Sequence, residues 1–141
     1  MLDRSAILVT EDEPLIALDL VLAIEEADGT VVGPTSTVRE ALALIEQQPI
    51  AAAILDVNLI DGDISPVVER LMEHNVPIIL QSGVGAPPPL IARFPDLLVR
   101  IKPNLARELV AETAHFWTCA AIRPVSVRLI RRLIEGWSNL V

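Results

Sequence analysis

Short apolar runs alternate with longer amphipathic segments along most of the chain. The runs are rich in Ala, Ile, Leu and Val, and they lie at 6–10, 30–33, 50–56, 76–81 and 97–101. Near-continuous apolar runs of this length are typical of strands buried on both faces of a sheet. Helical spacing of apolar residues predicts helices after Pro14, after Thr37, around Val67–Met72 and over 105–118. The alternation predicts an α/β fold with helices on both faces of a parallel sheet.

Local signals place the ends of several elements. The first helix can begin at Pro14 and end at Asp28-Gly29. Its apolar positions at helical spacing are Leu15, Leu18, Val21, Leu22 and Ile24. Thr37 and Glu40 have the spacing of a capping box, which opens the second helix. Asp61-Gly62-Asp63 is a predicted turn, and the prolines at 87–89 leave only a short helix around Leu90 to Phe94.

The C-terminal segment has its own apolar periodicity. Pro124 precedes a stripe made of Val127, Ile130, Ile134, Trp137 and Val141, which predicts a further helix. We therefore expect a domain over 1–118 and a helical extension over 119–141. A stripe this broad is expected to fold back on its own domain or to meet a second copy. We expect the second outcome, a homodimer through the C-terminal helix.

Composition narrows the possible partners. The hydrophobic fraction is 52%, yet no run approaches the ~18 apolar residues of a membrane span. There is no basic-then-apolar N-terminal segment of the kind that directs export, so we expect a cytoplasmic protein with no membrane partner. The net charge of −8 argues against nucleic acid as a partner. Cys119 is the only cysteine, and we expect a small buried hydrophobe rather than a metal ligand.

Acidic residues follow two of the predicted strands. Asp56 closes the run 50–56, and Glu11-Asp12-Glu13 follows the run 6–10. Burying a carboxylate is costly unless it is paired or bound to a metal, so a purely structural role for Asp56 is disfavoured. In an open α/β sheet, ligands collect beyond the carboxyl ends of the strands. The two clusters therefore predict one acidic pocket for a hard cation such as Mg²⁺.

Four motifs at strand ends resemble the receiver domain of bacterial two-component response regulators. In order they are Glu11-Asp12, Asp56, Ser82-Gly83 and Lys102-Pro103, and the resemblance covers residues 5 to about 118. Any one of these motifs alone is weak evidence for the family. All four together, in this order and at these strand ends, are a specific signal. The resemblance implies a five-stranded, doubly wound parallel sheet in the flavodoxin-like order 2-1-3-4-5.

The resemblance also implies roles for the metal-binding residues. Asp12 would bind Mg²⁺ directly, and Glu11 would bind it directly or through water. Asp56 would be a further ligand, and Asn58 would offer its backbone carbonyl.

Three residues would handle the phosphoryl group by the same resemblance. Asp56 would be the nucleophile that forms an acyl phosphate, and Ser82 would hydrogen-bond a phosphoryl oxygen. Lys102, the only lysine of the chain, would pair with the phosphoryl group as a point charge. The resemblance also implies a cis Lys102-Pro103 bond, while the sequence alone permits either isomer. Because the charge of Lys102 is needed at the pocket, we expect it to matter for phosphate handling rather than for folding.

The expected function is that of a stand-alone response regulator rather than an enzyme. It would accept phosphate from a histidine kinase or a phosphotransfer protein, and would signal to an unidentified downstream protein or pass the phosphate on in a relay. A small Mg²⁺-dependent phosphatase is one alternative, but Asn58 stands where such enzymes carry a second, titratable Asp. A phosphorylation-independent interaction module is the other alternative. Two features keep this second alternative open. Val99 stands at a position where the family often has an aromatic residue, and prolines occupy 87–89.

Overall fold

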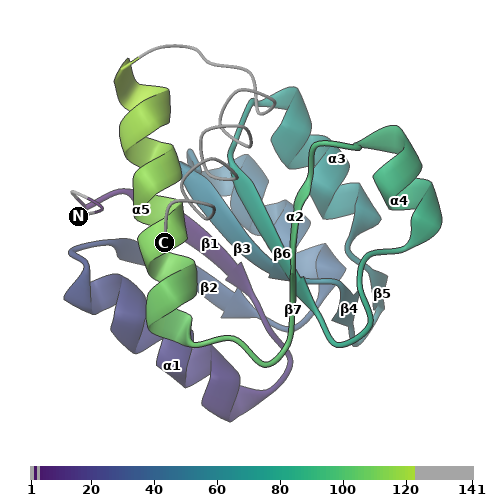
Figure 1. Ribbon diagram of the computed structural model, residues 1–141, viewed down its shortest axis with the longest axis horizontal. Helices are drawn as coiled ribbons and strands as arrows, with labels where there is room; N and C mark the ends of the chain where they lie inside the picture. The colour runs from purple at the N-terminus through teal and green to yellow at the C-terminus, as the bar shows by residue number, and fades with distance from the viewer. Residues whose placement is uncertain (1, 3, 123–141) are drawn as a thin grey trace, which may run out of the picture.

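A five-stranded parallel sheet forms the centre of the molecule (Figure 1). The computed structural model describes residues 2 and 4–122, with side chains up to residue 115. The strands are β1 (Ala6–Thr10), β2 (Thr30–Thr35), β3 (Ala52–Asp56), β6 (Ile78–Ser82) and β7 (Leu98–Ile101). Their order is β2-β1-β3-β6-β7, with every neighbouring pair parallel. The predicted flavodoxin-like order is therefore confirmed.

Helices cover both faces of this sheet. They are α1 (Pro14–Glu26), α2 (Val38–Gln47), α3 (Ser65–Glu73), α4 (Pro88–Arg93) and α5 (Ala106–Ile122). Helices α1 and α5 lie on one face, and α2, α3 and α4 lie on the other (Figure 1). Within the described part of the chain, none of the helices combines the length and the apolarity that a membrane span requires.

The alternation of side chains along each strand divides the core into two layers. On β3, Ala52 and Ile54 pack in the layer under α1 and α5, whereas Ala53 and Leu55 pack in the layer under α2 and α3. Because successive side chains of a strand point to opposite faces, Asp56 shares the face of Ala52 and Ile54. This directs the acidic residue that ends β3 toward α1 and α5.

Besides small shifts at the ends of other elements, three segments differ from those expected. Strand β2 continues to Thr35 rather than ending at Gly33, since Pro34 lies in an edge strand, where the missing N–H costs no ladder hydrogen bond. The predicted turn at 61–63 belongs to a small antiparallel hairpin of β4 (Asn58–Leu59) and β5 (Gly62–Asp63). Helix α5 runs to Ile122, past the expected end at 118. The division into 1–118 and 119–141 stays a prediction. The side chain of Cys119 and the predicted helix and dimer contact at 127–141 lie outside the described residues.

The apolar face assigned to α1 was wrong in part. Leu15, Leu18 and Leu22 are 78%, 52% and 50% exposed. The buried positions are Ala17, Leu20 and Ile24. Because α1 carries aliphatic residues almost all round its circumference, periodicity alone did not determine which side meets the sheet.

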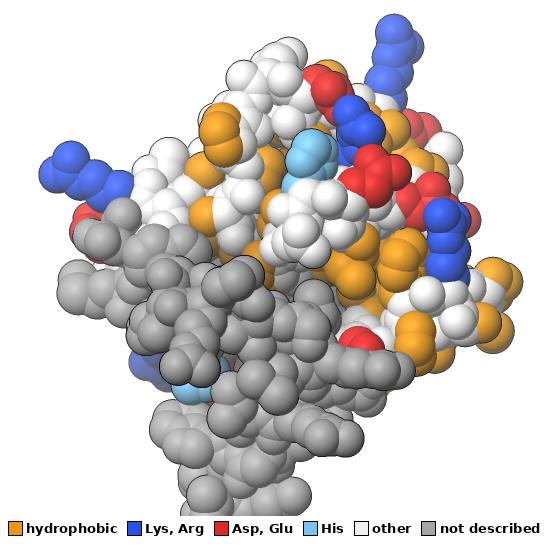
Figure 2. Space-filling view, turned by 90° about the horizontal axis from the view of Figure 1, so that it is seen from above, with side chains coloured by type: hydrophobic (Ala, Val, Ile, Leu, Met, Phe, Trp, Pro, Cys, Tyr) orange, Lys and Arg blue, Asp and Glu red, His pale blue; other side chains and the backbone are white. Residues whose placement is uncertain are grey.

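Opposite charges lie next to one another on the outer helices. Arg70 of α3 forms ion pairs with Glu46 of α2 and with Glu73, and Arg93 of α4 pairs with Glu69. The face shown in Figure 2 carries basic and acidic side chains close together, with hydrophobic side chains between them. Exposed pairs of this kind contribute little to stability, typically about 0–1 kcal/mol each.

Candidate functional site

The carboxyl ends of four neighbouring strands bring polar side chains to one edge of the sheet. Glu11 follows β1, Asp56 ends β3, Ser82 ends β6 and Lys102 follows β7. All four positions are those expected from the sequence. Since the strands are parallel, their carboxyl ends meet at the same edge, which is where ligands bind in open α/β sheets.

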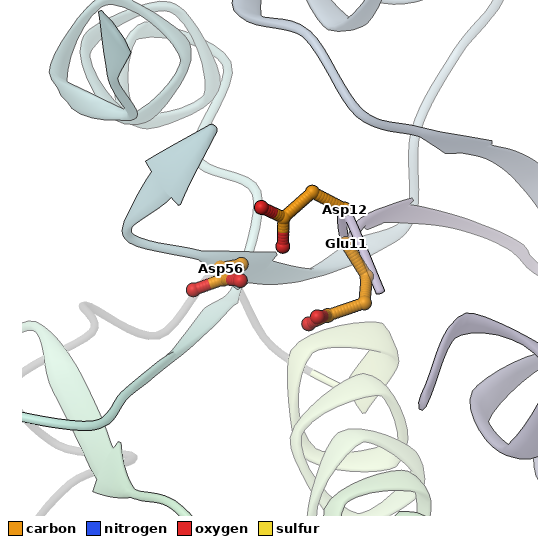
Figure 3. A group of neighbouring side chains, drawn as sticks. All are labelled: Glu11, Asp12 and Asp56. Atoms are coloured by element: carbon orange, nitrogen blue, oxygen red, sulfur yellow. The ribbon is translucent and has the colours of Figure 1, made fainter. Parts of the chain in front are cut away.

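Three carboxylates converge at this edge. Oxygen atoms of Glu11, Asp12 and Asp56 lie within 4.8 Å of one another (Figure 3). Glu11 is 3% exposed and Asp56 is 7% exposed, whereas Asp12 is open to solvent. A cluster of carboxylate oxygens, partly buried and open on one side, is the donor set that Mg²⁺ prefers, because this ion takes a few carboxylates and keeps several waters. The three residues fit such an ion.

Lys102 links two carboxylates of the acidic cluster. Its Nζ donates to Asp56 Oδ2 at 3.1 Å and to both carboxylate oxygens of Glu11, at 3.3 and 3.4 Å. Its backbone N–H donates to Ser82 O at 2.8 Å, which continues the ladder between β6 and β7 by one residue. The Lys102-Pro103 bond is cis, as the resemblance implied. The only lysine of the chain therefore holds two nearly buried carboxylates together.

The charges of this cluster shift the pKa values of two of its members. Burial, followed by the negative charge of Asp56, raises the pKa of the Glu11 carboxyl, although the Lys102 ammonium acts in the other direction. Burial alone would lower the pKa of Lys102, but hydrogen bonds and charges from Asp56 and Glu11 outweigh it, so the pKa of Lys102 is raised. Three carboxylates thus face one ammonium, which leaves an excess of negative charge for a divalent cation to balance.

Two hydrogen bonds fix the backbone of the cluster. The Asp56 N–H donates to Thr10 Oγ1 at 3.0 Å, and the Glu11 N–H donates to Thr35 O at 3.0 Å. Thr10 is fully buried, so its hydroxyl ties the end of β1 to the end of β3. Sequence reasoning missed this contact. The available signal was a hydroxyl residue at the end of an otherwise apolar strand, Ala6–Thr10.

The structure does not bring every predicted site residue into the cluster. The Ser82 hydroxyl donates to Gly85 O at 2.8 Å and accepts from the Val84 N–H at 3.2 Å, so it is satisfied within its own loop. Asn58 is exposed in β4, where it lies opposite Asp63. A contact of Ser82 with a phosphoryl group, and of the Asn58 carbonyl with a metal, therefore stay predictions.

The β4–β5 hairpin has a structural role that the sequence did not reveal. Asp61 accepts hydrogen bonds from the backbone N–H groups of Val38 and Arg39, at 2.6 and 3.1 Å, and so caps α2 from 23 residues away along the chain. The Val38 contact, and then that of Arg39, lower the pKa of Asp61. Thr37 caps the same helix by accepting from the Glu40 N–H at 3.1 Å. The Glu40 carboxylate accepts instead from Thr35 Oγ1, so only half of the expected capping box forms.

Comparison with known proteins agrees with this arrangement, although no family model matches the chain. The chain is 37% identical over 86 residues to the photosynthetic apparatus regulatory protein RegA of Cereibacter sphaeroides. This match covers 60% of the chain and 46% of RegA. It therefore spans about half the length of this curated relative. Its fold is similar to that of a response regulator receiver protein from Sinorhizobium medicae, with a TM-score of 0.70 at 21% identity over 84% of the chain and 98% of that protein.

SdrG from Sphingomonas melonis combines a similar fold with higher sequence identity. Its solution structure matches with 39% identity and a TM-score of 0.63, over 81% of this chain and 98% of SdrG. A structure described as the BeF3-activated conformation of SdrG matches with 40% identity and a TM-score of 0.59. Because this identity extends over almost the whole of a receiver domain, the chain belongs to the receiver family of response regulators.

Proposed function

We propose that the chain accepts a phosphoryl group on Asp56 from a histidine kinase or a phosphotransfer protein. The observation that carries the proposal is the position of Asp56, which ends the central strand 3.1 Å from Lys102 and beside Glu11 and Asp12. The similarity to SdrG, for which a BeF3-activated conformation has been described, supports the same conclusion, since beryllium trifluoride imitates a phosphoryl group.

Asp56 and Lys102 would have different roles in the phosphoryl transfer. A carboxylate oxygen of Asp56 attacks phosphorus, the new P–O bond forms, and the bond between phosphorus and the donor atom breaks. Lys102 keeps its charge throughout, because its pKa is raised, and it lies close enough to balance charge on the incoming group. In this proposal the chain is a phosphoryl acceptor and not an enzyme.

Magnesium would be held by Glu11, Asp12 and Asp56, with the backbone carbonyl of Asn58 as a further ligand. When bound, the ion would neutralise negative charge on the phosphoryl oxygens. The cluster carries more acidic groups than basic ones, so Lys102 and the ion would together balance its negative charge.

Phosphorylation would be read by another protein, either as a changed surface or as a phosphoryl group passed on in a relay. Val99 stands where many receivers carry an aromatic residue, and it is half-buried against the core cluster under α2, α3 and α4. A readout through a large swinging ring is therefore unavailable at this position, and the signal would leave through the backbone and loops around the site.

The direct test is incubation with acetyl phosphate and Mg²⁺, followed by intact mass measurement. We expect a mass gain of one phosphoryl group in the wild type and none in Asp56→Asn. Asp61→Asn is the matched control, because Asp61 is an exposed Asp of the next hairpin, outside the cluster. Labelling that persists in Asp56→Asn, or that is lost equally in Asp61→Asn, would contradict the assignment.

A further inference from the structure

Gln81 is a buried polar residue with no role in the site as described so far. It precedes the last residue of β6, and only 2% of its surface is exposed. Its side-chain nitrogen Nε2 is buried and has no hydrogen-bond partner among the described residues. Leaving a buried donor unpaired is unfavourable, so an unpaired amide in a strand of a native protein calls for an explanation.

The register of the sheet places Gln81 beside the phosphoryl acceptor. Gln81 lies opposite Asp56 across the β3–β6 ladder and opposite Arg100 across the β6–β7 ladder. Partners in a parallel ladder point to the same face of the sheet, so the side chains of Gln81 and Asp56 are neighbours on the face of α1 and α5. Lys102, two residues after Arg100, reaches Asp56 across the end of β6. Gln81 therefore lies between the acceptor carboxylate and the strand that supplies its cation.

A cavity of about 180 Å³ adjoins Gln81. Gln81 and Lys102 line it from the sheet, while Leu20 of α1 and Leu109 of α5 line it from the helices. This volume is several times the ~30 Å³ that one water occupies in the liquid. Gln81 therefore lies beside open space between the sheet and the two helices, although its Nε2 is itself buried.

In the unphosphorylated protein the carboxylates near Gln81 accept side-chain hydrogen bonds from Lys102, and the Gln81 Nε2 donates to none of them. The Lys102 ammonium donates to Asp56 Oδ2 and to both oxygens of Glu11. A phosphoryl group on Asp56 would add three strong acceptor oxygens to this same region. Phosphorylation would thus bring further hydrogen-bond acceptors to the face of the sheet on which the Gln81 amide is unpaired.

We propose that the side-chain amide of Gln81 donates a hydrogen bond to the phosphoryl group on Asp56, as a second donor beside Lys102. The inference rests on the proposed phosphorylation of Asp56 and adds a residue to that site. Because the bond is made in the phosphorylated state and has no counterpart in the unphosphorylated one, it favours the acyl phosphate. Hydrolysis, in which water attacks phosphorus, the bond to Asp56 breaks and phosphate is released with a proton, is slowed accordingly.

Nuclear magnetic resonance of the side-chain amides tests the contact directly. The NH₂ pair of Gln81 is identified as the pair missing in Gln81→Met. With acetyl phosphate and Mg²⁺, this pair should shift downfield in the wild type and should not shift in Asp56→Asn treated in the same way. An unshifted pair in wild-type protein that mass measurement shows to be phosphorylated overturns the inference while leaving the proposed function intact. A wild type that gains no phosphoryl group rejects both.

The lifetime of the acyl phosphate gives a second, independent readout. Methionine keeps the length of the side chain but lacks the amide donor, so Gln81→Met should lose phosphate about 3 to 10 times faster than the wild type. Gln48→Met is the matched control, since Gln48 is exposed at the end of α2, and its lifetime should equal that of the wild type. A merely structural role for Gln81 would change the melting temperature but not the lifetime. Equal lifetimes in Gln81→Met and the wild type overturn the inference.

Discussion

Replacement of Lys102 by Met should destabilise the protein, although a lysine after a strand end would ordinarily be a surface charge. The side chain of Lys102 is 24% exposed, while those of its partners Glu11 and Asp56 are only 0% and 10% exposed. Removing the ammonium therefore leaves two neighbouring carboxylates buried without a counter-charge. The expectation that Lys102 serves phosphate handling alone is too narrow, because the structure gives it this second role.

The size of the loss follows from how buried the cluster is. Removing one partner of a fully buried ion pair costs about 3–5 kcal/mol, whereas an exposed pair is worth about 0–1 kcal/mol. The cluster lies between these limits, since the carboxylates of Glu11 and Asp56 are nearly buried but Asp12 opens it to water. We expect Lys102→Met to lower the free energy of unfolding by about 1–3 kcal/mol at pH 7.5 without divalent cations.

Urea unfolding at low ionic strength with EDTA measures this loss. Arg39→Met is the control, because it removes an exposed cation that lies outside the cluster. Lys102→Met combined with Glu11→Gln should recover most of the lost stability, since one of the two uncompensated charges is gone. Added Mg²⁺ should narrow the gap between Lys102→Met and the wild type, because the cation takes over part of the neutralisation.

The pH dependence of the loss has a defined direction. The pKa of Glu11 is raised in the folded protein, so its ionisation costs stability above its folded pKa, and the cost disappears as the pH falls toward the ordinary pKa of 4.5. Without Lys102 this cost is larger, so the deficit of Lys102→Met should shrink between pH 7.5 and pH 5. The pKa of Lys102 is also raised, so its contribution is fully present below 10.5 and is lost as the pH rises through its folded pKa. Equal unfolding free energies for Lys102→Met and the wild type at pH 7.5 would show that the carboxylates are well solvated and would refute this reasoning.

Two further predictions concern the metal and the hairpin. In a Mg²⁺ titration followed by calorimetry, Asp12→Ala should lose most of the affinity for Mg²⁺ and Glu13→Ala should lose little. The reason is that Asp12 belongs to the carboxylate cluster and Glu13 does not. Equal losses in the two variants would mean that the wrong residues are assigned to the cluster. Asp61→Ala should lower the urea midpoint at pH 7, because Asp61 caps the N-terminus of α2. The pKa of Asp61 is lowered by the Val38 N–H, so this stabilisation is present above the ordinary pKa of 3.8 and is lost as the pH falls through the folded pKa. A midpoint difference that is unchanged between pH 7 and pH 2 would argue against the cap.

The strands were predictable because a strand buried on both faces leaves an unbroken apolar run. All five runs found in the sequence are strands of the sheet, with ends shifted by at most a few residues. The inward face of α1 was not predictable in the same way, because a helix with leucines on several sides has no single apolar stripe. The β4–β5 hairpin escaped notice because strands of two residues carry no periodicity.

At the site, the residue types could likewise be inferred from the sequence, whereas their contacts could not. Asp56 and the acidic cluster could be identified because a carboxylate that ends an apolar run is unusual, and because parallel strands end at one edge. The reach of Lys102 to both Asp56 and Glu11 depends on the order of β1, β3 and β7 across the sheet, which no local pattern contains.

Gln81 illustrates why a buried residue can matter without a local signal. In the sequence it is one polar residue near the end of an apolar run, and its equivalence to Asp56 exists only through the β3–β6 register. In the folded protein the two residues lie on one face, next to a lysine whose donors are already engaged with carboxylates. Lys102 therefore serves the carboxylates before phosphorylation, while the Gln81 amide donor stays unpaired. On this reasoning the hydrogen bonds that Lys102 and Gln81 donate to the phosphoryl group together determine how long the acyl phosphate persists.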